Sequence, residues 1–137
     1  THAQRRQMHL REVALQAGLR VHVHPFPSTV HCDDRIGMAA VYCLPWAEQR
    51  HTRAAWLLTK RAYPHQLHFD GVWEWQGEGR EEQAVLLRSA LAKVPEKVLA
   101  VARGPQGLCC YWSELGSEDD VNQLAAWLKD ELLSIAS

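Results

Sequence analysis

The spacing of hydrophobic and polar residues changes along the chain, and each change marks a predicted element. Residues 3–17 repeat their apolar positions at helical spacing and are followed by Gly18, a natural stop for a helix. Residues 19–24 instead alternate apolar and polar, which predicts a half-buried strand. Residues 38–44 form a short, continuously apolar run, which is typical of a central strand covered on both faces.

The middle of the chain is predicted to add two helices and a hairpin. Residues 46–62 place small apolar residues on one face at helical spacing, so we expect a helix there. In residues 66–75 the dipeptide Asp70-Gly71 separates two short apolar runs, which is a strong hairpin signal. Residues 80–94 again carry an apolar stripe at helical spacing and are followed by a proline.

The C-terminal part predicts a second hairpin and a final helix. Residues 97–112 turn through 104–107, and a helix after Ser117 begins with acidic residues. The predicted order is therefore α-β-β-α-β-β-α-β-β-α, an α+β fold in which about four helices pack on an antiparallel or mixed sheet. The sequence contains no G-x-G-x-x-G or G-x-x-x-x-G-K-[ST] motif, which disfavours a doubly wound nucleotide-binding fold.

Composition and cysteine usage are those of one soluble domain spanning residues 1–137. The 137 residues are 47% hydrophobic and 23% charged, with a net charge of −1. The overall charge therefore gives no reason to expect nucleic acid or an anionic membrane as partner. The longest apolar runs are too short to cross a bilayer. The cysteines form no C-x-x-C pair, so we expect a reducing, cytoplasmic setting in which no disulfide is needed.

A basic face is the first candidate binding surface. Opposite the small-residue stripe of the predicted helix 46–62 lies a set of cations with an aromatic side chain among them: Arg50, Arg53, Trp56, Lys60 and Arg61. Such a face is able to dock an acidic partner or a phosphate backbone, although charge runs often serve solubility alone. Trp127 stands off the apolar stripe of the last predicted helix, which suggests either an interface or a seam between helix and sheet.

A histidine-rich stretch, residues 20–34, offers a different chemistry. His22 and His24 project from the same face of the predicted strand, about 7 Å apart by strand rise. That spacing lets two imidazoles bind one Zn²⁺ or a similar ion, and Asp33 or Asp34 would supply a third ligand. The alternative is an ordinary strand whose histidines face solvent. We expect no tightly held metal, because no strict ligand spacing is met.

The same stretch resembles the metal-binding motif of the JAMM metallopeptidases, in which His-x-His-Pro precedes a loop, a serine and an aspartate. His22, His24 and Ser28 match that pattern, with Asp33 in the place of the last ligand. The resemblance implies a metal-dependent hydrolase. The sequence departs from the motif because Ser28 and Asp33 are five positions apart and because the only upstream glutamate, Glu12, lies in a predicted helix.

No complete catalytic constellation appears in the sequence, so binding is the preferred hypothesis over catalysis. We expect a small cytoplasmic protein-binding module, an accessory, adaptor or inhibitor protein of bacterial or phage type, with another protein as its partner and no cofactor. The first alternative is a metal-dependent hydrolase that uses His22 and His24 with Asp33 or Asp34. The second alternative is nucleic-acid binding through the basic helix predicted at residues 46–62.

Overall fold

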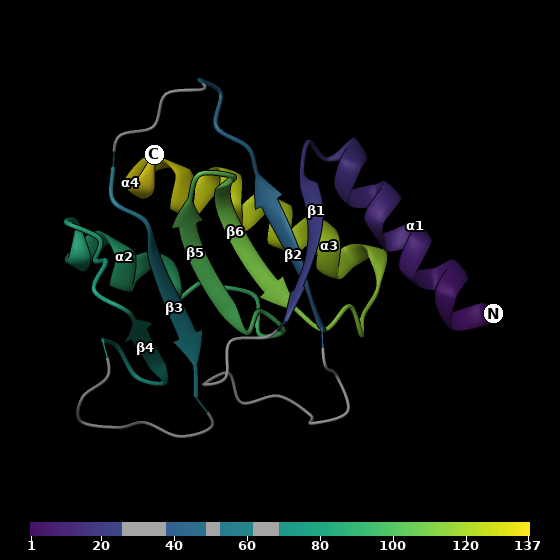
Figure 1. Ribbon diagram of the computed structural model, residues 1–137, viewed down its shortest axis with the longest axis horizontal. Coiled ribbons are helices and arrows are strands. Elements are labelled where there is room, and N and C mark those ends of the chain that lie inside the picture. Colours follow the sequence, from purple (N-terminus) through teal and green to yellow (C-terminus); the bar gives the residue numbers. More distant parts are fainter. Residues whose placement is uncertain (26–37, 49–52, 62–68) are drawn as a thin grey trace.

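The computed structural model describes residues 1–25, 38–48, 53–61 and 69–137, and these residues form a six-stranded antiparallel sheet with helices against one face (Figure 1). Across the sheet the strands follow the order β1-β2-β6-β5-β3-β4. The strands are β1 Arg20–Pro25, β2 Met38–Leu44, β3 Trp56–Lys60, β4 Trp73–Gln76, β5 Ala100–Gly104 and β6 Gly107–Trp112.

Three helical segments pack on that face in the described part of the chain. The first, α1 (His2–Gln16), lies against β1 and against α3. The second, α2 (Ala84–Leu91), contacts the C-terminal segment. That segment begins as α3 (Glu118–Trp127), continues through a π-helical stretch, η1 (Leu128–Leu132), and ends as α4 (Leu133–Ala136). In Figure 1 it passes behind the sheet, so it forms the backing of the core.

Alternation along the strands gives the sheet two different faces. One face joins the helices in the main core, and its central side chains are Tyr42, Leu58, Val101 and Cys110. The opposite face carries a separate apolar cluster built from strand residues alone, namely Val41, Cys43 and Cys109, with Ala102 and Tyr111 packed against it. Because neighbouring strands pair in register, each of these clusters runs across several strands.

The helix predicted at residues 46–62 is wrong where the structure describes that segment. Residues Trp56–Lys60 form β3, an inner strand between β5 and β4. Trp56 and Leu58 both point into the main core, so burial here follows a period of two. Pairing on both edges of β3 overrides the helical preference of the local sequence. Over the described ranges the order is therefore α-β-β-β-β-α-β-β-α, with three helical segments where about four helices were predicted.

The other predicted elements within the described residues are largely confirmed. The alternating and apolar runs form β1 and β2, and β5 turns into β6 with Gly104 opposite Gly107. Asp70 bridges Trp73 across the predicted Asp70-Gly71 turn. The backbone N–H of Ser117 donates to the carboxylate of Asp120 at the start of α3, as expected for a helix start. Among the residues the structure describes, no helix is long and apolar enough to cross a membrane.

Candidate interaction surface

The outer side of α2 exposes aliphatic side chains that the core does not use. Leu87, Ala90 and Leu91 are buried, which fixes the orientation of the helix. Val85 is 75% exposed and Leu86 is 49% exposed on the solvent side. Val85 has the highest exposed fraction of the large hydrophobic side chains in the described ranges. Exposed aliphatic side chains on a well-packed helix are typical of a contact surface when other binding side chains lie beside them.

Two aromatic rings lie next to α2 and are each covered by an arginine. The rings of Phe69 and Trp75 are 4.9 Å apart between centroids, and both are partly buried. The guanidinium of Arg88 lies 4.7 Å from the centroid of Phe69, and that of Arg80 lies 5.2 Å from the centroid of Trp75. Arg88 also follows Val85 by three positions on α2, so their side chains share one face of the helix.

We call this region the α2–β4 surface and define it by the five side chains that make it: Phe69, Trp75, Arg80, Val85 and Arg88. No Asp or Glu in the described parts of the chain forms an ion pair with Arg80 or Arg88. Aromatic residues and arginine are enriched in protein interfaces and in their energetic hot spots. The surface therefore combines apolar, aromatic and cationic groups whose charge is not neutralised from within.

The turn that carries Arg80 is held in place by backbone contacts. A Cβ at Gly79 would lie 1.8 Å from the carbonyl oxygen of Ala55. The turn therefore packs so closely against the backbone before β3 that only glycine fits at this position. Nη1 of Arg80 donates to the carbonyl oxygens of Gly77, at 2.7 Å, and Gly79, at 2.8 Å. The arginine is thus fixed over Trp75 by its own turn.

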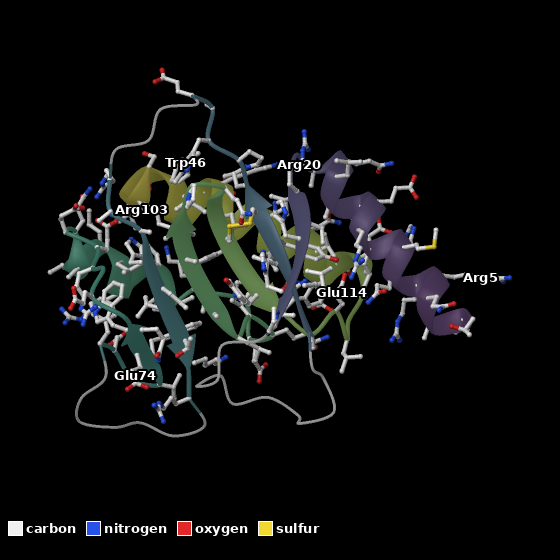
Figure 2. The ribbon with its side chains drawn as sticks, in the orientation of Figure 1. Arg5, Arg20, Trp46, Glu74, Arg103 and Glu114 are labelled. Atoms are coloured by element: carbon white, nitrogen blue, oxygen red, sulfur yellow. A yellow bond between two sulfur atoms is a disulfide. The ribbon has the colours of Figure 1, made fainter. Side chains whose placement is uncertain are left out.

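A buried ion cluster supports the start of α2. Arg103 is fully buried, and its Nη1 donates to Oε1 of Glu81 at 2.5 Å. Oε2 of Glu81 accepts from Arg53 at 2.7 Å and from the backbone N–H of Gln83 at 2.9 Å. Burial lowers the pKa of Arg103, against the opposing effect of Glu81. In Figure 2 Arg103 lies among β5, β3 and the C-terminal segment, so the cluster joins these three parts beneath α2.

A second buried carboxylate, Glu114, fixes α1 at the other end of the sheet (Figure 2). Arg11 donates to both of its oxygens, at 2.8 and 2.9 Å, and Tyr42 donates to it at 2.7 Å. Burial, followed by the hydrogen bond to Glu114, raises the pKa of Tyr42. Glu114 adopts a left-handed backbone with a φ of 62°. The cluster has its hydrogen bonds satisfied from within, so its role is to dock α1.

The residues expected to form a basic face are in contact with other parts of the domain. Arg53 binds Glu81, Glu82 and the C-terminal carbonyl oxygens, and Trp56 is buried with its Nε1 directed at Glu81. Lys60 donates to the carbonyl oxygen of Glu96, and Arg61 pairs with Glu74. Arg50 lies outside the described residues. The described members therefore do not form one exposed patch.

Trp127 lies in the seam between helices. It is buried, and its Nε1 donates to the carbonyl oxygen of Ala90 in α2 at 2.8 Å. Its position off the apolar stripe of α3 therefore reflects packing against α2. The α2–β4 surface was missed by the sequence reasoning, yet one signal was present: Val85 and Leu86 fall outside the apolar stripe of their own helix.

The histidine pair has the predicted geometry on β1. The ring centroids of His22 and His24 are 6.3 Å apart, and both rings lie on the face opposite the helices. Asp33, Asp34 and Ser28 lie outside the described residues. Within the described ranges, no group of three or more His, Cys, Asp or Glu is arranged to hold a metal ion. Two imidazoles alone do not complete a zinc site.

Two of the cysteines are joined. Cys43 of β2 and Cys109 of β6 are direct cross-strand partners and form a disulfide. The thiol of Cys110 is buried on the other face, and burial raises its pKa. The sequence led us to expect that no disulfide was needed, because nothing in the spacing of the cysteines identifies β2 and β6 as neighbours. Cys32 lies outside the described residues.

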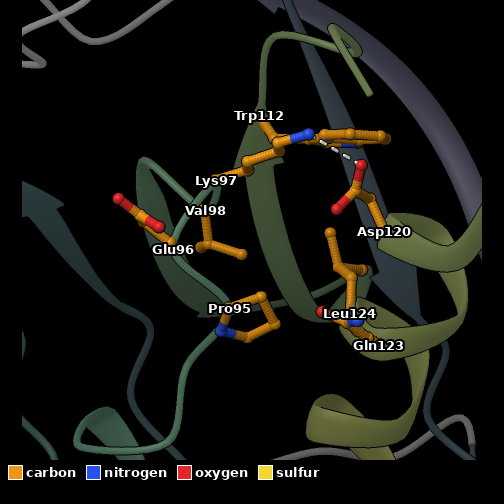
Figure 3. A pocket seen from close by; sticks show the side chains of 8 residues that line it. All are labelled: Pro95, Glu96, Lys97, Val98, Trp112, Asp120, Gln123 and Leu124. Atoms are coloured by element: carbon orange, nitrogen blue, oxygen red, sulfur yellow. Dashed lines mark hydrogen bonds and ion pairs between the residues drawn. The ribbon is translucent and has the colours of Figure 1, made fainter. Parts of the chain in front are cut away.

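A small pocket opens between α3 and the segment before β5 (Figure 3). Its volume is about 160 Å³. Trp112 lies at one end beside the Lys97–Asp120 ion pair of 2.8 Å, and Pro95 lies at the other end. The hydrogen bond from Lys97, followed by that from Ser117, lowers the pKa of Asp120. Lys97 and Asp120 pair with each other, whereas the carboxylate of Glu96 and Nε1 of Trp112 have no hydrogen-bond partner among the described residues.

The α2–β4 surface therefore combines exposed aliphatic side chains with arginines that have no carboxylate partner among the described residues. Comparison with known proteins gives no independent guide to its role, because no protein family, curated protein or solved structure matches this chain.

Proposed function

We propose that this domain is a protein-binding module and that its partner docks on the α2–β4 surface. The observation that carries the proposal is Val85, a 75% exposed aliphatic side chain on a packed helix. Val85 shares a face of α2 with Arg88, which lies over Phe69, and the Phe69 ring in turn packs against Trp75 beneath Arg80. An accessory, adaptor or inhibitor role needs a surface of this kind and no catalytic groups.

Preorganisation supports the same proposal. The α2 helix is held by its buried face and by the Glu81–Arg103 pair at its start. Gly79 seats the adjoining turn against Ala55. A surface that is already rigid loses less conformational entropy when it binds, so more of the contact energy appears as affinity.

The experiment compares partner binding by matched variants. Val85→Asp places a charge in the middle of the proposed contact, near the start of α2, where an acidic residue suits the helix dipole. Met8→Asp is the control, because Met8 is similarly exposed, at 70%, but lies on α1. Proteins retained by the immobilised wild type are identified, purified and titrated against all three proteins by biolayer interferometry.

The expected result is that a partner binds the wild type and Met8→Asp equally and binds Val85→Asp at least about 30-fold more weakly, which is the loss of one hot-spot side chain. Circular dichroism spectra of the three proteins should coincide. Equal binding by Val85→Asp and by the wild type would exclude this surface as the docking site.

The two alternative functions receive less support. Nucleic-acid binding was expected through a basic helix, and the described part of that segment is strand β3. The metal-dependent hydrolase has only His22 and His24 of its expected ligands within the described residues, and it stays a prediction. Metal analysis of protein purified without a metal-affinity column would support the hydrolase if it found one equivalent that disappears in a His22→Ala, His24→Ala variant.

The cytoplasmic location also stays a prediction. Disulfides persist mainly in oxidising compartments, so the Cys43–Cys109 bond favours such a compartment instead. Trapping of free thiols in cells with an alkylating reagent, followed by mass spectrometry of the two cysteines, decides between the two settings. A cytoplasmic location requires both thiols to be alkylated.

A further inference from the structure

We infer that the partner of the α2–β4 surface contributes an acidic, apolar peptide segment whose carboxylates pair with Arg80 and Arg88. This inference rests on the proposed protein-binding function and adds the chemistry of the partner. Arg80 and Arg88 are each backed by an aromatic ring, the two rings pack against each other, and Arg88 shares a face of α2 with the exposed Val85. The surface therefore matches a segment with apolar side chains flanked by carboxylates.

The arginines keep hydrogen-bond donors available for such a partner. Arg80 uses Nη1 for the carbonyl oxygens of its own turn, and its Nε and Nη2 donate to no group in the described residues. Arg88 makes no hydrogen bond to the described part of the chain and lies over Phe69. A guanidinium fixed on a ring is well placed to bind a carboxylate through two N–H groups.

The other arginines of this end of the domain behave differently. Arg53 and Arg103 pair with Glu81 and Glu82, and Arg61 pairs with Glu74. Their charges are therefore neutralised within the fold. Among the described residues, Arg80 and Arg88 are the arginines of this region that pair with no carboxylate of the fold and so stay available to an external anion. Phosphate would satisfy the same donors, but the exposed aliphatic side chains of α2 favour a protein segment over a nucleic acid.

The test is selection from a random library of 12-residue peptides on immobilised protein. Parallel selections use the wild type, Val85→Asp, Arg80→Gln with Arg88→Gln, and a control, Arg5→Gln with Arg6→Gln. The control removes the same charge from exposed positions of α1; Figure 2 shows Arg5 projecting from that helix. Kd values of selected peptides are then measured by fluorescence anisotropy at low and high salt.

We expect the wild type and the control to select peptides in which Asp or Glu flanks apolar residues. Binding of these peptides should weaken about tenfold in the Arg80→Gln, Arg88→Gln protein, as expected for the loss of two partly exposed ion pairs. It should also fall with salt in the wild type and much less so in that variant. Folding of each protein is verified by its circular dichroism spectrum and its unfolding midpoint.

Three outcomes would overturn the inference, and they separate it from the proposed function. The acidic segment is rejected if the selected peptides are not enriched in Asp or Glu, or if the arginine variant and its control bind them equally. If binding in these cases still depends on Val85, the proposed protein-binding surface is retained. Peptide binding that is unchanged in Val85→Asp rejects both. Tight binding of a labelled single-stranded oligonucleotide that needs the arginines and not Val85 assigns the surface to nucleic acid instead.

Discussion

Reduction of the Cys43–Cys109 disulfide should destabilise the domain by an amount that the chain connectivity sets. The bond closes a loop with a sequence separation of 66 residues between β2 and β6. In the chain-entropy treatment, a loop of that length removes enough freedom from the unfolded chain to stabilise the fold by about 4 kcal/mol at 25 °C. We therefore expect the urea midpoint of the reduced protein to lie about 2 M below that of the oxidised protein.

The assay follows far-UV circular dichroism during urea unfolding with and without dithiothreitol. Oxidised and reduced wild type have the same side chains, so their difference isolates the cross-link from packing effects. A Cys43→Ala, Cys109→Ala variant should lose all sensitivity to dithiothreitol, whereas Cys110→Ala should keep it, because Cys110 is a free thiol. Mass spectrometry of the non-reduced protein, alkylated after unfolding in denaturant because Cys110 is buried, should find one modified cysteine of these three.

Two results would refute this reasoning. If the oxidised and reduced proteins unfold at the same urea concentration, the loop does not restrict the unfolded chain as described. If the sensitivity to dithiothreitol persists in the double variant, it arises from some other cysteine.

Three further predictions follow from buried and exposed contacts. Glu114→Ala should lower the free energy of unfolding, measured by urea titration, by about 3–5 kcal/mol, because it leaves buried hydrogen-bond partners unpaired. Glu118→Ala removes an exposed ion pair with α1 and should lower the same free energy by less than about 1 kcal/mol. Gly79→Ala should strongly lower the melting temperature of the domain, because its methyl group would lie 1.8 Å from a carbonyl oxygen. Gly104→Ala, whose methyl group would meet nothing within 4 Å, should leave the melting temperature nearly unchanged. The hydrogen bond from Arg53 lowers the pKa of Glu82 from 4.5 to about 2, so its stabilisation is complete above pH 4.5 and is lost as the pH falls toward 2. Glu82→Gln should therefore flatten this acid limb in melts between pH 5 and pH 2, and an unchanged limb would contradict the assignment.

The sequence predicted those parts of the fold that depend on local signals. Strand β1 and the turn between Gly104 and Gly107 each depend on residues close in the chain, and both are confirmed, but the predicted burial of one face of β1 fails at Val23, which is 47% exposed. Strand β3 was mistaken for a helix because its neighbours, β5 and β4, lie elsewhere in the sequence and supply the pairing that decides its conformation.

In the candidate surface, too, some features follow from local sequence signals and others depend on contacts between distant segments. Val85 could be identified as an outward-facing apolar residue from the helical period alone. The sequence does not reveal which arginines lack a carboxylate partner, because Arg53 and Arg103 pair with Glu81 only when distant segments of the chain meet. The exposed charge was predicted on arginines that include Arg53 and Arg61, and in the structure both of these pair with carboxylates of the fold.

The strand order has a consequence for synthesis of this protein on the ribosome. The two central strands, β6 and β5, come last in the chain, whereas β1, β2, β3 and β4 flank them and emerge first. The early strands therefore leave the exit tunnel as two hairpin-like pairs that have no sheet to join until residues 100–112 follow. Their unpaired edges are exposed during that interval, which is the period when a chaperone protects a nascent chain from aggregation. The β5–β6 hairpin, closed by a two-residue turn, then completes the sheet from its centre outward.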